Sequence, residues 1–87
     1  MKLKYNIVIT QVGDQWIAAA TGSDADKFKN VIFLNKVGAF IIECLSSEIT
    51  QEELLQKVAD KYDGETDQID QSITSFVKEL KTLGLLD

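Results

Sequence analysis

The sequence predicts an α+β domain in which a three-stranded antiparallel sheet is followed by three helices, in the order βββααα. Two observations predict this order. Through the first third of the chain apolar side chains alternate with polar ones, as in half-buried strands, whereas from Asn35 onward they recur every three or four residues, as in amphipathic helices. With 87 residues, 45% of them hydrophobic and 26% charged, the chain is large enough for one modest core. Residues 1–87 are therefore expected to form a single domain.

The predicted sheet begins with a hairpin. Residues 5–12 alternate between apolar and polar side chains, a Gly-Asp pair supplies a two-residue turn, and residues 15–21 return as a second strand. Residues 22–26 are expected to form a loop because of their composition. Residues 30–34 then predict a short third strand, since they are rich in strand formers and too few for a helix.

The first helix is predicted over residues 36–45, with Asn35 as its N-cap. Gly38 lies inside this helix, where glycine costs about 1 kcal/mol relative to alanine, so a close approach of another backbone is expected there. Cys44 lies on the apolar face of the same helix. Because free cysteine is among the most buried residue types, we expect it to be a small core residue.

The second helix has a clear start. Thr50 and Glu53 have the spacing of a capping box, in which each residue's side chain bonds the other's backbone N–H. The helix is expected to end at residues 63–64, an Asp-Gly pair typical of turns.

The third helix, within residues 67–86, is predicted to be the longest. Thr66 or Asp67 is expected to cap its start, and Gly84 is expected to end it in a left-handed conformation. Its apolar stripe comprises Ile69, Ile73, Phe76, Val77, Leu80 and Leu83, of which Leu80 and Leu83 are expected in the core.

The composition argues against several classes of function. The chain has neither histidine nor arginine and carries a net charge of −5, so nucleic acid is not expected as a partner. A catalytic thiol or histidine-ligated metal is not expected either, and glycine-rich phosphate loops and calcium loops are absent from the sequence. Because neither a signal peptide nor a membrane span is visible, a cytoplasmic location is expected. The sequence predicts a protein that is not an enzyme and uses no cofactor or metal.

Four sequence features together resemble those of a known family. They are Leu34-Asn35-x-x-Gly38, Thr50-x-x-Glu53-Leu54, Tyr62, and Ile73-x-x-Phe76-Val77-x-x-Leu80-x-x-x-Gly84-Leu85-Leu86. In this order and spacing they resemble the PqqD-like family over residues 28–87. Members of that family are peptide chaperones, also called recognition elements, of ribosomally synthesised and post-translationally modified peptides (RiPPs).

The resemblance implies a winged helix-turn-helix fold and a function without catalysis. Family members bind the leader segment of a precursor peptide as an added strand, which pairs with the third strand and rests on the third helix. They present it to a modifying enzyme in cofactor or natural-product biosynthesis, and a radical SAM enzyme is the expected partner. The chain departs from the family pattern at Ile42, where an aromatic residue is common, and at Ser72, where an acidic residue is favoured. Asp70 is a candidate to replace that acid.

The residues themselves favour peptide binding. The short third strand carries no charge or proline that would block pairing at an open edge, so an extended peptide can add to it by β-augmentation. Alternate side chains of the peptide would then enter pockets between this strand and the third helix. The predicted peptide-binding residues are Val31, Ile32, Phe33, Ile69, Asp70, Ile73, Phe76 and Val77. Ile73 and Phe76 are equally consistent with core positions, and either face of the third strand is consistent with burial.

Two other functions fit the same architecture. One is a winged-helix DNA-binding regulator, although the predicted surfaces of the second and third helices carry more carboxylates than lysines. The other is a homodimer in which two copies pair through the bare edge strand.

Overall fold

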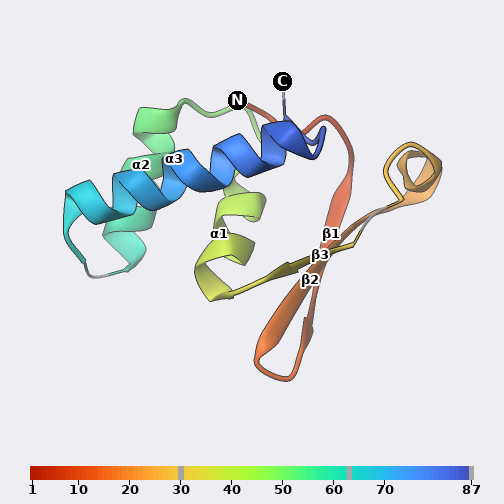
Figure 1. The fold of residues 1–87 in the computed structure, drawn as a ribbon, viewed down its shortest axis with the longest axis horizontal. Helices are drawn as coiled ribbons and strands as arrows, with labels where there is room; N and C mark the ends of the chain where they lie inside the picture. The colour runs from red at the N-terminus through yellow and green to blue at the C-terminus, as the bar shows by residue number, and fades with distance from the viewer. Residues whose placement is uncertain (30, 63, 87) are drawn as a thin grey trace.

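The computed structural model describes residues 1–29, 31–62 and 64–86. Three strands form an antiparallel sheet in the order β1-β2-β3 and three helices follow, so the α+β class and the βββααα order are confirmed. The helices gather at one end of the molecule, and the sheet with a short 3-10 helix occupies the other (Figure 1). The elements are β1 (Ile7–Val12), β2 (Gln15–Ala20), η1 (Gly22–Asp26), β3 (Ile32–Leu34), α1 (Lys36–Cys44), α2 (Gln51–Lys61) and α3 (Thr66–Thr82).

The hairpin and its register determine which side chains of the sheet face the core. Gly13 has a φ of 61° and no described non-glycine residue has a positive φ, which is the pattern of a type II′ turn. Ala18 pairs with Ile32 and is only 1% exposed, so this row faces the helices. Ile17 and Phe33 pair in the alternate row, which faces away. The buried face of β3 is therefore the face of Ile32.

The core lies between the inner face of the sheet and the three helices. The first residues of the chain cross over it, because the N–H of Leu3 donates to the carbonyl of Leu45 and the N–H of Lys4 to that of Leu85, each at 2.9 Å. Burying one large aliphatic side chain contributes roughly 1.5–3 kcal/mol, so burial of the core side chains holds the helices against the sheet. The largest fully buried side chains are Ile42, Leu45, Leu54, Val58, Ile73, Leu80 and Leu85.

Side-chain caps start the first two helices as predicted. Asn35 Oδ1 accepts the N–H of Gly38 at 2.7 Å, and Thr50 and Glu53 form both bonds of the capping box at 3.1 Å. The expected backbone approach at Gly38 is wrong. A Cβ there would lie 3.3 Å from side-chain atoms of Leu34 and Asn35, so side chains rather than another backbone crowd this position.

The start of α3 differs from the prediction. Glu65 occupies the N-cap position without a side-chain cap bond, and Thr66 and Asp67 are the first two helical residues. Asp67 still lies in the first turn, where a negative charge suits the helix dipole. The predicted end of α2 falls partly on Asp63, which lies outside the described residues; the last helical residue is Lys61.

The end of α3 is a Schellman motif. Gly84 has a φ of 85°, and the N–H of Leu85 donates to the carbonyl of Leu80 at 2.9 Å, while the N–H of Gly84 donates to that of Lys81 at 3.1 Å. The reversal at Gly84 places Leu85 in the core. Leu83 is 42% exposed, so its predicted core position is wrong.

Some predicted boundaries shift by one or two residues. β1 begins after Tyr5, whose ring stacks on Phe28 with the ring centroids 6.2 Å apart. The segment expected to be a loop is the 3-10 helix Gly22–Asp26. Val31 precedes β3, and Asn30 lies outside the described residues.

Candidate functional site

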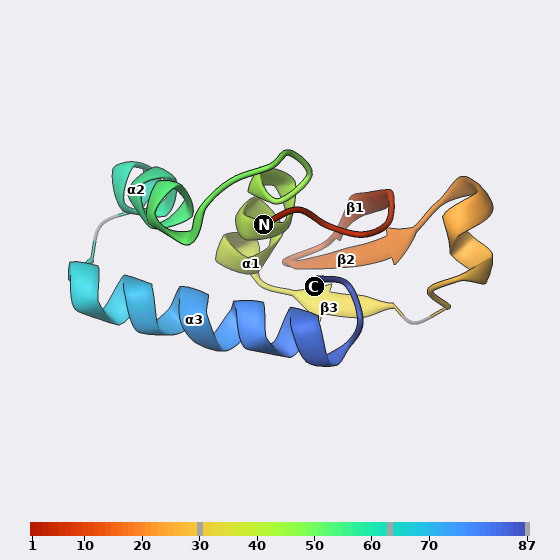
Figure 2. The same ribbon diagram turned by 90° about the horizontal axis from the view of Figure 1, so that it is seen from above.

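The open edge of β3 is the first component of the candidate site. In the described sheet β3 pairs only with β2, so the backbone groups along its other side face away from the sheet. In Figure 2, β3 lies next to the C-terminal half of α3, whereas Figure 1 shows the two elements apart. The strand Ile32–Leu34 contains neither a charged residue nor proline, so its own residues do not block an incoming strand.

A groove of about 370 Å³ lies between β3 and α3. Phe33 stands on the β3 side and is 69% exposed, whereas Phe76 on the α3 side is half-buried. We call this hollow the β3–α3 groove. Its lining residues are Phe33, Asn35, Val37, Gly38, Ile41, Ser72 and Phe76.

A second hollow, of about 240 Å³, lies between the three helices toward the start of α3. We call it the inner hollow. It shares Val37, Ile41 and Ser72 with the β3–α3 groove, so the two adjoin. Its remaining lining residues are Val58, Tyr62, Gly64, Glu65, Gln68, Ile69 and Ile73.

The start of α1 and one small residue of α3 shape the β3–α3 groove. The cap bond from Gly38 N–H to Asn35 Oδ1 holds the first turn of α1 directly after β3. Gly38 adds no side chain to this wall, and across from it Ser72 contributes only a hydroxymethyl group. The groove is therefore open where a larger side chain at either position would fill it.

Four of the predicted site residues lie together. Phe33 and Phe76 line the β3–α3 groove, and Ile69 and Ile73 line the inner hollow. Ile73 is 0% exposed, so it belongs to the core as well as to the wall of the hollow. Ile73 and Phe76 were equally consistent with the core and with a binding surface. Each contacts the core and also lines a hollow, because the same face of α3 borders both.

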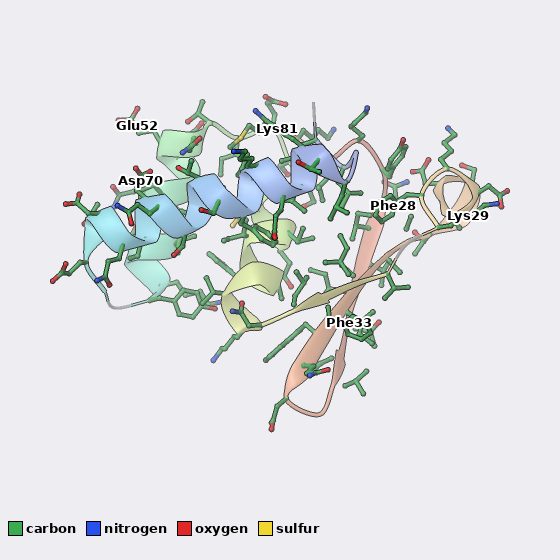
Figure 3. The ribbon with its side chains drawn as sticks, viewed as in Figure 1. Phe28, Lys29, Phe33, Glu52, Asp70 and Lys81 are labelled. Carbon is green, nitrogen blue, oxygen red and sulfur yellow. The ribbon has the colours of Figure 1, made fainter. Side chains whose placement is uncertain are left out.

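The other four predicted residues lie elsewhere. Val31 is half-exposed just before β3, Ile32 faces the core, and Val77 is buried in it. Asp70 lines neither hollow and lies about 120° around the helix from Phe76. In Figure 3, Asp70 lies along the upper side of α3, away from β3.

Five residues of the β3–α3 groove are absent from the predicted site. Asn35 and Gly38 are visible in the sequence as a helix start, and Val37 and Ile41 as part of an apolar helix face. Ser72 is visible only as a departure from a family pattern. None of these signals shows which neighbouring element the residue faces, so packing alone assigns them to the groove.

The β3–α3 groove is uncharged, and the clear pKa shifts lie outside it. Hydrogen bonds from Thr50 lower the pKa of Glu53, and burial raises the pKa of the Cys44 thiol against the opposing effect of nearby Lys57. Cys44 is half-buried and packs against the core, in line with the small core residue predicted. The groove offers apolar surface, two neutral polar side chains and the unpaired backbone of β3.

Within the described part of the chain, no three histidine, cysteine, aspartate or glutamate side chains are placed to hold a metal ion. The described helices are also too short or too polar to cross a membrane.

Comparison with known proteins identifies relatives of the chain. Residues 16–86 match the family model for PqqD, described as coenzyme PQQ synthesis protein D. The comparison with curated protein sequences found no match.

Two solved structures share the fold. The chain is similar to TbiB1 in complex with the TbiA(beta) leader peptide, with a TM-score of 0.75 and 18% identity over 100% of this chain and 95% of that chain. It is also similar to a lasso peptide synthetase B1 complexed with the leader peptide, with a TM-score of 0.68 and 20% identity over 97% of this chain and 93% of that one. At these identities the likeness shows a common fold.

Proposed function

The chain belongs to the PqqD family, a family of non-catalytic peptide-binding proteins, and we propose from this that it is a RiPP recognition element. It captures the leader segment of a ribosomally made precursor peptide and presents it to a modifying enzyme. Both similar solved structures are complexes with leader peptides, which supports this choice of ligand.

The observation that carries the proposal is the open edge of β3 beside an apolar groove. An extended peptide satisfies unpaired backbone groups at a strand edge, and its alternate side chains enter pockets beside that edge. Here the edge and the β3–α3 groove adjoin, since Phe33 belongs to both. Backbone pairing provides affinity with little demand on sequence, and the groove provides selectivity.

The binding residues divide by role. The backbone of β3 pairs with the leader, Phe33 and Phe76 flank it, and Ile69 with Ile73 form the apolar end that a side chain reaches through the inner hollow. Val31 extends the pairing edge. Ile32 and Val77 act from the core by holding β3 and α3 at the right separation.

The partner that follows in this scheme is a modifying enzyme of the radical SAM type. The proposal for this enzyme class rests on the family to which the chain belongs. The recognition element holds the leader, and the enzyme acts on the remainder of the same precursor. No cofactor is assigned to the recognition element itself.

A titration followed by NMR tests the function. The probe is a synthetic peptide with the leader sequence of a precursor encoded beside this gene. We expect saturable amide shifts at Val31–Phe33 and along α3 from Ile69 to Val77. A genuine neighbouring leader that produces no shifts in these two segments would show that the proposal is wrong.

A pair of variants locates the binding surface. Ser72→Trp fills the β3–α3 groove and is expected to weaken leader binding at least about tenfold, which corresponds to about 1.4 kcal/mol. Gln71→Trp places the same side chain on an exposed position of α3 outside both hollows, and its affinity is expected to stay within about twofold of the wild type. Equal losses in both variants would contradict binding in the groove.

A further inference from the structure

In an antiparallel sheet, residue pairs alternate between hydrogen-bonded and non-hydrogen-bonded, and the first hairpin determines the phase of this alternation here. The two-residue turn makes the pair that closes the hairpin a hydrogen-bonded pair, and such pairs alternate along an antiparallel ladder. The alternation makes the pair of Thr10 with Ile17 hydrogen-bonded. The same phase also predicts a bonded pair of Asn6 with Thr21, and the N–H of Thr21 does donate to the carbonyl of Asn6 at 3.0 Å. The phase is thus fixed at both ends of the hairpin.

This phase decides which backbone groups of β3 face the open edge. Ile17 directs both its N–H and its C=O toward β1, so its pair with Phe33 on the other side is not hydrogen-bonded. Phe33 therefore directs its N–H and C=O away from β2, toward the open edge. Ile32 and Leu34 direct theirs toward β2.

A peptide added at this edge pairs through the backbone of Phe33. The side chain of the peptide residue directly opposite lies on the same face of the sheet as Phe33, since facing residues of adjacent strands share a face. That face is the one opposite to Ala18, away from the core. The peptide residues on either side of it, aligned with Ile32 and Leu34, point instead toward the β3–α3 groove.

The outer face of the sheet is uncharged around this position. Phe33 has the most exposed large apolar side chain described, at 69%, and Val8 and Val12 on the same face are also half-exposed or more. A charged peptide side chain beside Phe33 would find no partner on this face. The residues of the face are Val8, Thr10, Val12, Gln15, Ile17, Ala19 and Phe33.

We infer that the leader is read on both faces of the sheet, and that Phe33, which borders the groove, also determines specificity on the outer face. The leader residue paired with Phe33 carries a large apolar side chain, aromatic or β-branched, that packs across the strands onto the Phe33 ring. Its neighbours on both sides also carry apolar side chains, which enter the groove. The recognised segment is thus three consecutive apolar residues rather than a strict alternation. This inference rests on the proposed function and adds the sequence class of the ligand.

A double-mutant cycle tests the inference with the synthetic leader peptide. The paired residue of the peptide is identified by the nuclear Overhauser effect between its amide and that of Phe33. We expect Phe33→Ala and replacement of the paired peptide residue by alanine each to weaken binding about two- to fivefold. Combining them should weaken binding no more than the larger single change, because both remove one contact. Val12→Ala, on the same face but distant from the edge, should leave affinity unchanged.

The possible outcomes separate this inference from the proposed function. If Phe33→Ala and Phe33→Thr bind the peptide as the wild type does while Ser72→Trp does not, reading on the outer face is wrong and groove binding stands. Single changes whose effects multiply independently would also overturn the inference. The same holds if Phe33→Ala changes only the sedimentation of the free protein, because Phe33 would then serve a second copy of the chain. If the wild type shows no shifts with the peptide at all, the proposed function itself fails.

Discussion

Phe33 and Phe76 line the same groove from opposite sides, although one belongs to the shortest strand and the other to the longest helix. Their shared groove depends on where α3 is held, and α3 is held in place because Ile73, Val77 and Leu80 are buried in the core. The groove is thus a by-product of core packing. Changes in the core are therefore expected to alter the width of the groove, even where they do not touch its lining.

Replacing Gly84 by alanine should destabilise the protein by about 1 kcal/mol. The residue has a φ of 85°, a conformation that costs about 1–2 kcal/mol for a residue with a Cβ. An added Cβ would meet nothing within 4 Å, so the change measures the backbone alone. Urea unfolding measures the loss, and Gln71→Ala, at an exposed position within α3, is the control. Equal stability of Gly84→Ala and the wild type would show that the left-handed turn is not required.

Replacing Thr50 by alanine should lower the free energy of unfolding by about 1 kcal/mol, because the N–H of Glu53 loses its acceptor. Glu52→Ala removes a carboxylate from the same first turn of α2 without removing a cap bond, and it should cost less. Thermal or urea unfolding of both variants gives the comparison. A larger loss for Glu52→Ala would indicate that dipole charge, not capping, starts α2.

Acid should remove part of the contribution of Glu53. Its folded pKa is lowered chiefly by the hydrogen bond from the backbone N–H of Thr50. A lowered folded pKa means that the stabilisation is complete above the unfolded pKa of about 4.3 and is lost as the pH falls through the folded value. Glu53→Gln keeps a hydrogen-bond acceptor but does not titrate. Between about pH 5 and pH 3 the urea midpoint of this variant should therefore fall less than that of the wild type. Parallel pH profiles would contradict the assignment.

Two apolar residues of α3 should differ sharply when shortened. Ile73 is 0% exposed, so Ile73→Val should cost about 0.5–1.5 kcal/mol, the range for removing one buried methyl group. Leu83 is 42% exposed, and Leu83→Ala should cost less per carbon atom removed. Chemical unfolding of both variants measures the difference. Similar losses per carbon would place Leu83 in the core after all.

The Cys44 thiol should react slowly with iodoacetamide near neutral pH. Burial raises its pKa, so less of the reactive thiolate is present than in an unfolded chain, and Lys57 partly offsets this effect. Lys57→Gln should raise the pKa further and slow alkylation again. Alkylation rates measured over about three pH units around an ordinary thiol pKa, from pH 7 to 10, give the pKa of Cys44 in the wild type and in Lys57→Gln. Faster alkylation in Lys57→Gln would contradict the electrostatic effect.

The spacing of apolar residues predicted the order of strands and helices well, but it predicted some helix ends incorrectly. Alternation identifies β1 and β2, and the recurrence of apolar residues identifies α1 to α3, because burial imposes these periods. Composition identifies β3, whereas η1 was expected to be a loop. The start of α3 is less determined. Glu65, Thr66 and Asp67 are consecutive polar residues, and the path of the chain out of α2 decides which of them precedes the helix.

The site was predictable only in part because an apolar stripe does not name its neighbours. The sequence places Phe76 on the buried side of α3 but gives no information on whether Ser72 or Asp70 faces β3. Packing turns Ser72 toward the groove and Asp70 away from it. Leu83 shows the same limit, since the reversal at Gly84 brings Leu85 into the space that continued periodicity would have assigned to Leu83.

In the described sheet β3 has one open edge, and an open edge can pair with only one added strand. If a second copy of the protein takes that place, a leader cannot, so self-association and cargo loading exclude each other. The share of loaded protein then falls as the protein itself becomes more concentrated. The concentration of the protein would then influence how much precursor is held ready.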